Sequence, residues 1–82
     1  MSIWPSRNHK ILHNRLRDRR TERGLTQEAL GEAVGLTRQS IIAIEKGRFT
    51  PTVYTALTLA SALGVPVDDL FWIDSREGKE EP

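Results

Sequence analysis

Residues Thr26–Gly47 read TQEALGEAVGLTRQSIIAIEKG, a stretch that predicts two short helices joined by a tight turn. The predicted helices are Gln27–Val34 and Arg38–Lys46, and each follows a threonine whose hydroxyl oxygen can accept a free N–H of the first helical turn. Gly35 lies between them, where a sharp turn requires the positive φ that glycine adopts without steric cost. The pattern predicts a helix-turn-helix motif.

Three further helices are predicted around this pair, so the expected fold class is an all-α domain of five helices. They span residues 14–23, 53–63 and 67–71, and glycine, threonine or proline residues mark their ends. The segments Lys10–His13 and Phe71–Asp74 are short and rich in β-branched or aromatic residues. Either segment is therefore a candidate edge strand.

The apolar side chains repeat at helical spacing and predict the hydrophobic core. Around the central motif the expected core residues are Leu16, Leu25, Leu30, Val34, Ile41 and Ile44. In the fourth helix the expected inward stripe consists of Val53, Leu57, Ala60 and Leu63.

The chain has 82 residues and no cysteine. A chain this short buries about 60% of the surface that its unfolded form exposes, and no disulfide can add stability. The missing stability must then come from tight helix packing or from a second subunit. The second possibility makes a homodimer an expectation before any motif is considered. No apolar run is long enough to span a membrane and no signal peptide is recognised, so we expect a cytoplasmic protein.

Charge is distributed unevenly, although the formal net charge is only +1. Residues 1–24 hold seven Lys or Arg against two acids, and residues 66–82 hold six acids against two Lys or Arg. A basic face suits a polyanion such as DNA, but a solvated helix face accounts for the charge equally well. We expect a flexible arm at residues 1–9, a domain at residues 10–74 and a disordered acidic tail at residues 75–82.

The second helix of the motif carries the candidate residues for reading DNA. Ile41 and Ile44 occupy its inner face, which leaves Arg38 and Gln39 exposed in its first turn. When such a helix enters the major groove, Arg can bond O6 and N7 of guanine, and Gln can bond N6 and N7 of adenine. Ala43, one turn later, is short enough to let the groove floor approach or to touch a thymine methyl group.

Several motifs at linked spacing resemble the Xre type of helix-turn-helix repressors, and within it the short cytolysin-repressor-like members. The matching runs are RxxRGLTQExL from Arg20, VGLTRQSI from Val34, IEKG from Ile44 and LGVP from Leu63, with Pro51 between the last two. The resemblance covers roughly residues 14–72. It implies a lambda-repressor-like fold, with short terminal strands at a dimer interface, and a DNA-binding transcriptional regulator that represses from a palindromic operator.

The resemblance also implies roles at matching positions. Gln27 would bond a phosphate, and Arg20 would pair with Glu45. Together with the base-reading candidates above, the expected DNA-binding residues are Gln27, Thr37, Arg38, Gln39, Ser40, Ala43, Lys46, Arg48, Thr50 and Tyr54. The expected dimer interface consists of Ile11, Leu12, Phe71, Trp72 and Ile73.

Gly31 departs from the alanine that the resembling family usually carries at this position. Glycine inside a helix costs up to about 1 kcal/mol relative to alanine. We expect that cost to fall on the helix and not on the DNA-binding residues.

A protein-binding module of the antitoxin type is the alternative function, in which the helical domain or the acidic tail holds a partner protein. An enzyme is not expected, because the sequence has no Ser/His/Asp set, paired carboxylates, metal-ligand spacing or phosphate-binding glycine loop. His9 and His13 have no third ligand nearby in the sequence, so we expect neither a metal nor a cofactor.

Overall fold

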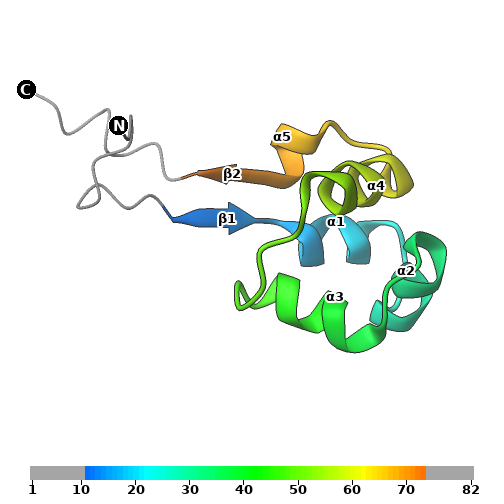
Figure 1. Ribbon diagram of the computed structural model, residues 1–82. Helices are drawn as coiled ribbons and strands as arrows, with labels where there is room; N and C mark the ends of the chain where they lie inside the picture. Colours follow the sequence, from blue (N-terminus) through cyan, green and yellow to red (C-terminus); the bar gives the residue numbers. More distant parts are fainter. Residues whose placement is uncertain (1–10, 74–82) are drawn as a thin grey trace, which may run out of the picture.

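The computed structural model describes residues 11–73, which form a helical domain with a short two-stranded sheet at one side (Figure 1). The predicted arm and acidic tail lie outside these residues. The elements follow in the order β1 Leu12–Asn14, α1 Leu16–Glu22, α2 Gln27–Val34, α3 Arg38–Glu45, α4 Val53–Leu63, α5 Val67–Leu70 and β2 Phe71–Ile73. The predicted fold class is confirmed.

Helices α2 and α3 form the predicted helix-turn-helix. The hydroxyl oxygen of Thr26 accepts the N–H of Ala29 at 2.9 Å, and that of Thr37 accepts the N–H of Ser40 at 3.1 Å. Gly35 ends α2 in the left-handed region, with φ at 77°, so the chain turns sharply into α3. The bounds of α2 are those predicted.

The outer helix ends differ from the prediction by one or two residues. Helix α3 stops at Glu45 because Lys46 is its C-terminal cap and the positive φ of Gly47 prevents another turn. Helix α1 starts at Leu16, because Asn14 belongs to a strand and its Oδ1 accepts the N–H of Leu16 at 3.0 Å.

Eight apolar residues from the five helices form the buried core, and none of them exposes more than 4% of its surface: Leu16, Leu30, Ile41, Ile44, Leu59, Ala60, Leu63 and Leu70. Leu25 and Val34 are partly buried against this core. The core predicted around the helix-turn-helix is therefore confirmed.

The predicted stripe of α4 is wrong in its first half. Val53 and Leu57 are 75% and 52% exposed, while Leu59, Ala60 and Leu63 are buried. Helix α4 packs mainly on α2 and α5, so its inner face is set by those contacts. Its sequence is apolar around most of its circumference, and spacing alone could not select the face.

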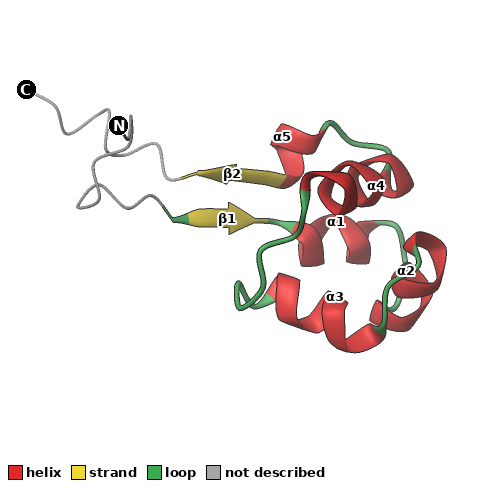
Figure 2. Cartoon of the chain, viewed as in Figure 1, coloured by secondary structure: helices red, strands yellow, loops and turns green. Residues whose placement is uncertain are grey.

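The two strands pair with each other in antiparallel register within one chain, with Leu12 opposite Ile73, His13 opposite Trp72 and Asn14 opposite Phe71 (Figure 2). Their bounds differ from the predicted 10–13 and 71–74: β1 runs to Asn14, and Asp74 lies outside the described residues. Helix α5 ends at Leu70 and not at Phe71, because the backbone of Phe71 is already extended.

Polar contacts attach the sheet to the helices. The side-chain N–H of Asn14 donates to the carbonyl oxygen of Ile44 at 3.0 Å, which joins β1 to α3. Within the sheet His13 stacks on Trp72 at a ring separation of 5.7 Å, and the guanidinium of Arg15, the residue before α1, lies 4.6 Å from the Trp72 ring centre. The sheet is thereby fixed to the body that carries α3.

Candidate nucleic-acid interface

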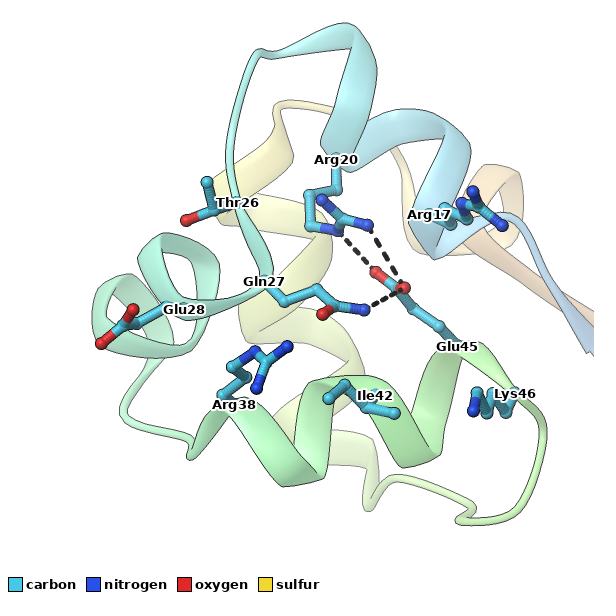
Figure 3. Close-up of a pocket in the computed structure, with 9 residues that line it drawn as sticks. All are labelled: Arg17, Arg20, Thr26, Gln27, Glu28, Arg38, Ile42, Glu45 and Lys46. Atoms are coloured by element: carbon cyan, nitrogen blue, oxygen red, sulfur yellow. Dashed lines mark hydrogen bonds and ion pairs between the residues drawn. The ribbon is translucent and has the colours of Figure 1, made fainter.

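A hollow of about 520 Å³ opens between α1, the start of α2 and the outer side of α3 (Figure 3). Nine residues line it: Arg17, Arg20, Thr26, Gln27, Glu28, Arg38, Ile42, Glu45 and Lys46. The hollow therefore combines side chains from both helices of the motif with two arginines of α1.

The polar network in this hollow is built on the Glu45 carboxylate. Arg20 donates from Nε to Glu45 Oε2 at 2.6 Å and from Nη2 to Oε1 at 3.3 Å, and Gln27 Nε2 donates to Oε1 at 3.1 Å. Arg20 Nη1 also donates to the carbonyl oxygen of Leu25 at 2.8 Å. These contacts tie α1, the start of α2 and the end of α3 together, and they confirm the expected Arg20–Glu45 pair.

Three exposed cations surround this network: Arg17 from α1, and Arg38 and Lys46 from the two ends of α3. Figure 3 shows Arg38, Ile42 and Lys46 in a row along α3. Because Glu45 is already paired with Arg20, its charge is compensated inside the network. Glu28, the other carboxylate of the lining, offsets one of the three cations, so the hollow keeps an excess of positive charge that attracts an anion, and a polyanion could contact several of the cations at once.

The other predicted residues of α3 follow its exposed side outside the hollow. Gln39 is exposed, and Ser40 and Ala43 are partly buried. The Thr37 hydroxyl donates to Ser40 Oγ at 3.1 Å while it caps the Ser40 N–H. The Ser40 hydroxyl is thus held at the start of α3 by Thr37.

The predicted residues after α3 lie on a neighbouring surface. Arg48 and Thr50 are exposed in the connection to α4, which runs beside the C-terminal end of α3 before it turns back (Figure 1). Tyr54, in the first turn of α4, is 77% exposed. The hollow brings together Gln27, Arg38 and Lys46 from the predicted set but not these three residues.

The predicted dimer residues divide into two groups. Ile11, just before β1, and Ile73, in β2, are 59% and 47% exposed. Leu12, Phe71 and Trp72 are partly buried, because Phe71 packs on the core and Trp72 stacks with His13. Only the first two thus offer much apolar surface to a partner.

Sequence reasoning missed Arg17 and Ile42 in the hollow. Arg17 lies three residues before Arg20, so helical spacing places both arginines on one face of α1. That spacing could have identified Arg17. Ile42 lies four residues after Arg38 and four before Lys46, so the same spacing places it on the face of these cations, but an isoleucine that follows Ile41 directly is usually assigned to the core.

Two other observations describe the part of the chain in the structure. Among residues 11–73, no three His, Cys, Asp or Glu side chains gather where they could hold a metal ion. No helix of this part is long and apolar enough to cross a membrane.

Residues 16–70 match the helix-turn-helix family. The chain is 49% identical, over 65 residues, to an uncharacterized HTH-type transcriptional regulator of Methanothermobacter thermautotrophicus, which covers 78% of this chain and 94% of the relative. It is 37% identical over 60 residues to the cryptic phage CTXphi transcriptional repressor RstR of Vibrio cholerae, covering 73% of this chain and 54% of that repressor.

Solved structures show the same fold. The restriction-modification controller protein C.AhdI of Aeromonas hydrophila superposes with a TM-score of 0.63 at 35% identity, over 66% of this chain and 78% of that one. The P22 c2 repressor, solved with a synthetic operator, gives a TM-score of 0.63 at 32% identity, over 65% and 80% of the two chains. The chain therefore belongs to the helix-turn-helix family of DNA-binding transcriptional regulators, of the lambda-repressor-like type.

Proposed function

We propose that this protein is a dimeric repressor that binds a palindromic operator, with α3 in the major groove of each half-site. The observation that carries the proposal is the surface of α3: Arg38 and Gln39 are exposed in its first turn, and Lys46 adds a cation at its end. The buried Arg20–Glu45 pair holds the helix behind this surface. A relative that is a phage repressor and a structural neighbour that is bound to an operator support the same function.

The proposed roles follow from position. Arg38 and Gln39 would contact base edges, with Ala43 close to the groove floor. Gln27 retains one side-chain N–H beyond the one that bonds Glu45, and that N–H would bond a phosphate. Thr37, Ser40, Lys46, Arg48, Thr50 and Tyr54 would contact the flanking backbone.

Selection of the preferred sequence from random duplexes tests the proposal, with Arg38→Ala measured in parallel. We expect a palindromic site with half-sites about 34 Å apart, and a loss of about 1–3 kcal/mol of binding free energy in the variant, with relaxed preference at one base pair. Arg23→Ala is the matched control, because it removes the same charge from an exposed arginine that does not line the hollow. Equal losses in both variants would contradict a reading role for Arg38.

Salt dependence separates backbone contacts from base contacts. Each phosphate neutralised adds about −0.9 to the slope of log affinity against log salt concentration. Lys46→Gln should reduce the slope by about one and weaken all duplexes alike. A change of sequence preference in Lys46→Gln would instead assign this lysine to a base.

The dimer is proposed through the sheet and its edge, where Ile73 of β2 and Ile11, just before β1, expose apolar surface. Sedimentation of the full chain should show a concentration-dependent dimer, and Ile73→Asp should weaken it. Leu57→Asp introduces the same charge at an equally exposed leucine of α4 and serves as the control. Dissociation by Leu57→Asp alone would place the interface on α4.

The antitoxin-like alternative rests on the exposed face of α4, where Val53, Tyr54 and Leu57 are 75%, 77% and 52% exposed. A monomeric chain that selects no duplex at moderate salt would favour this function.

The repressor proposal also places the protein in the cytoplasm, where it would meet its operator.

A further inference from the structure

Ile42 is an apolar residue on the polar side of α3. Its neighbours Ile41 and Ile44 are 0% and 1% exposed and belong to the core. Ile42 is only partly buried, and among the described residues it belongs neither to the core nor to the apolar side chains packed against it. Core packing therefore does not explain an isoleucine at this position.

The surroundings of Ile42 are charged. It lines the hollow one helical turn after Arg38 and one turn before Lys46, and Figure 3 shows its side chain between these two cations. Its remaining exposed surface therefore faces water in the free protein. Apolar surface gains free energy when it leaves water, so a ligand with an apolar group at this point would be favoured.

We propose that Ile42 contacts the 5-methyl group of a thymine in the operator. This inference rests on the proposed function, because it requires α3 to lie in the major groove. Thymine is the base that presents a methyl group on the major-groove edge, whereas the other three present only hydrogen-bonding groups there. Arg38 and Lys46, on either side, contact polar groups of the DNA and hold Ile42 against the methyl group.

Ile42 is better suited than Ala43 to contact this methyl group. Ala43 ends at its Cβ and does not line the hollow. Ile42 extends its apolar side chain into the row of cations, so it covers more of a methyl group and excludes more water from it. The two residues are distinguished by whether Ile42 variants abolish the effect of the thymine methyl group on affinity.

The test replaces thymine by deoxyuridine, which removes only the 5-methyl group. The full chain is titrated against its selected duplex, and each thymine of a half-site is replaced in turn. One replacement should weaken binding about fourfold per half-site, which corresponds to about 0.8 kcal/mol for one buried methyl group. A replacement outside the operator is the control for altered duplex properties.

The same titration with Ile42→Ser and Ile42→Val assigns the contact. The thymine-to-uracil effect should vanish in Ile42→Ser and shrink in Ile42→Val, while thermal melting shows that both variants fold. An unchanged methyl effect in both variants, or no methyl effect in the wild type, overturns the inference while specific binding remains. Absence of any specific duplex would overturn the proposed function itself.

Discussion

Arg20 Nε lies 2.6 Å from Glu45 Oε2, and this contact joins α1 to the last residue of α3. The two side chains are 10% and 6% exposed, so both charges are largely removed from water. Breaking a buried ion pair from one side leaves an uncompensated charge. The pair therefore controls both the stability of the domain and the position of α3.

Glu45→Ala should lower the free energy of unfolding by about 3–5 kcal/mol, because Arg20 then remains buried without its partner. Arg20→Met combined with Glu45→Leu removes both charges and should cost less than the single change, since apolar residues can replace a buried pair. Urea denaturation followed by circular dichroism measures the free energy of unfolding of both variants. A double variant less stable than Glu45→Ala would show that an unpaired Arg20 is not the main cost of losing Glu45.

Gly31→Ala should destabilise the protein, although alanine is the better helix former. An added Cβ would lie 2.6 Å from the carbonyl oxygen of Leu36, which is backbone and cannot rotate away. The higher helix propensity of alanine contributes about 1 kcal/mol of stability. The added methyl group forces the α2–α3 turn to shift, and such overpacking costs about 1–3 kcal/mol, which outweighs the gain.

Ala33→Gly, at an exposed position of the same helix, isolates the propensity contribution and should lose about 1 kcal/mol. Thermal melting of the two variants and the wild type gives the comparison. A Gly31→Ala protein that melts above the wild type would mean that the turn adapts without strain.

The central motif could be predicted from sequence because each of its boundaries has a local cause. Threonine caps and the positive φ of Gly35 act within a few residues, so they can be identified without knowledge of the fold. The Arg20–Glu45 pair is different. Its partners are 25 residues apart, and only the family resemblance suggested that they meet.

The misassigned features depend on tertiary contacts. The inner face of α4 is set by α2 and α5, so an apolar helix gave no basis for excluding Val53 and Leu57 from the core. Gly31 was expected only to weaken α2, since its close approach to Leu36 becomes visible only when the turn is built. Ile42 was missed for a different reason: it follows the core residue Ile41 directly and was therefore assigned to the core with it.

The contact between α1 and α5 should weaken in acid. Arg19 donates from Nε to Asp69 Oδ2 at 2.9 Å, and this hydrogen bond is the main cause that lowers the pKa of the Asp69 carboxyl below its ordinary value. A carboxyl whose pKa is lower in the folded than in the unfolded state stabilises the fold above the unfolded pKa, about 3.9, and loses that contribution as pH falls through the folded value.

Asp69→Asn should therefore melt below the wild type at pH 7, and the difference should shrink progressively below about pH 4. Asp68→Asn removes the same charge from the exposed neighbouring residue and is the control. A difference for Asp69→Asn that does not change with pH would mean that the ion pair with Arg19 does not contribute through its charge.

Two threonine caps of the same geometry separate helix stability from DNA binding. Thr37 accepts the N–H of Ser40 at 3.1 Å and donates to its hydroxyl oxygen at 3.1 Å, and Thr52 makes the same two contacts with Thr55 at the same distances. Replacing either threonine by alanine should cost about 1 kcal/mol of stability. The two variants thus lose the same local interactions at the starts of α3 and α4.

Thr37→Ala should weaken DNA binding more than Thr52→Ala and should alone relax base preference, because it frees the turn of α3 that is proposed to read bases, whereas the first turn of α4 is proposed to contact only the DNA backbone, through Tyr54. Affinity for the selected duplex, measured well below the melting temperature of both variants, gives the comparison. Thr37→Ser should restore both stability and affinity, since serine keeps the capping oxygen. Equal losses of affinity in Thr37→Ala and Thr52→Ala would contradict the placement of α3 in the major groove.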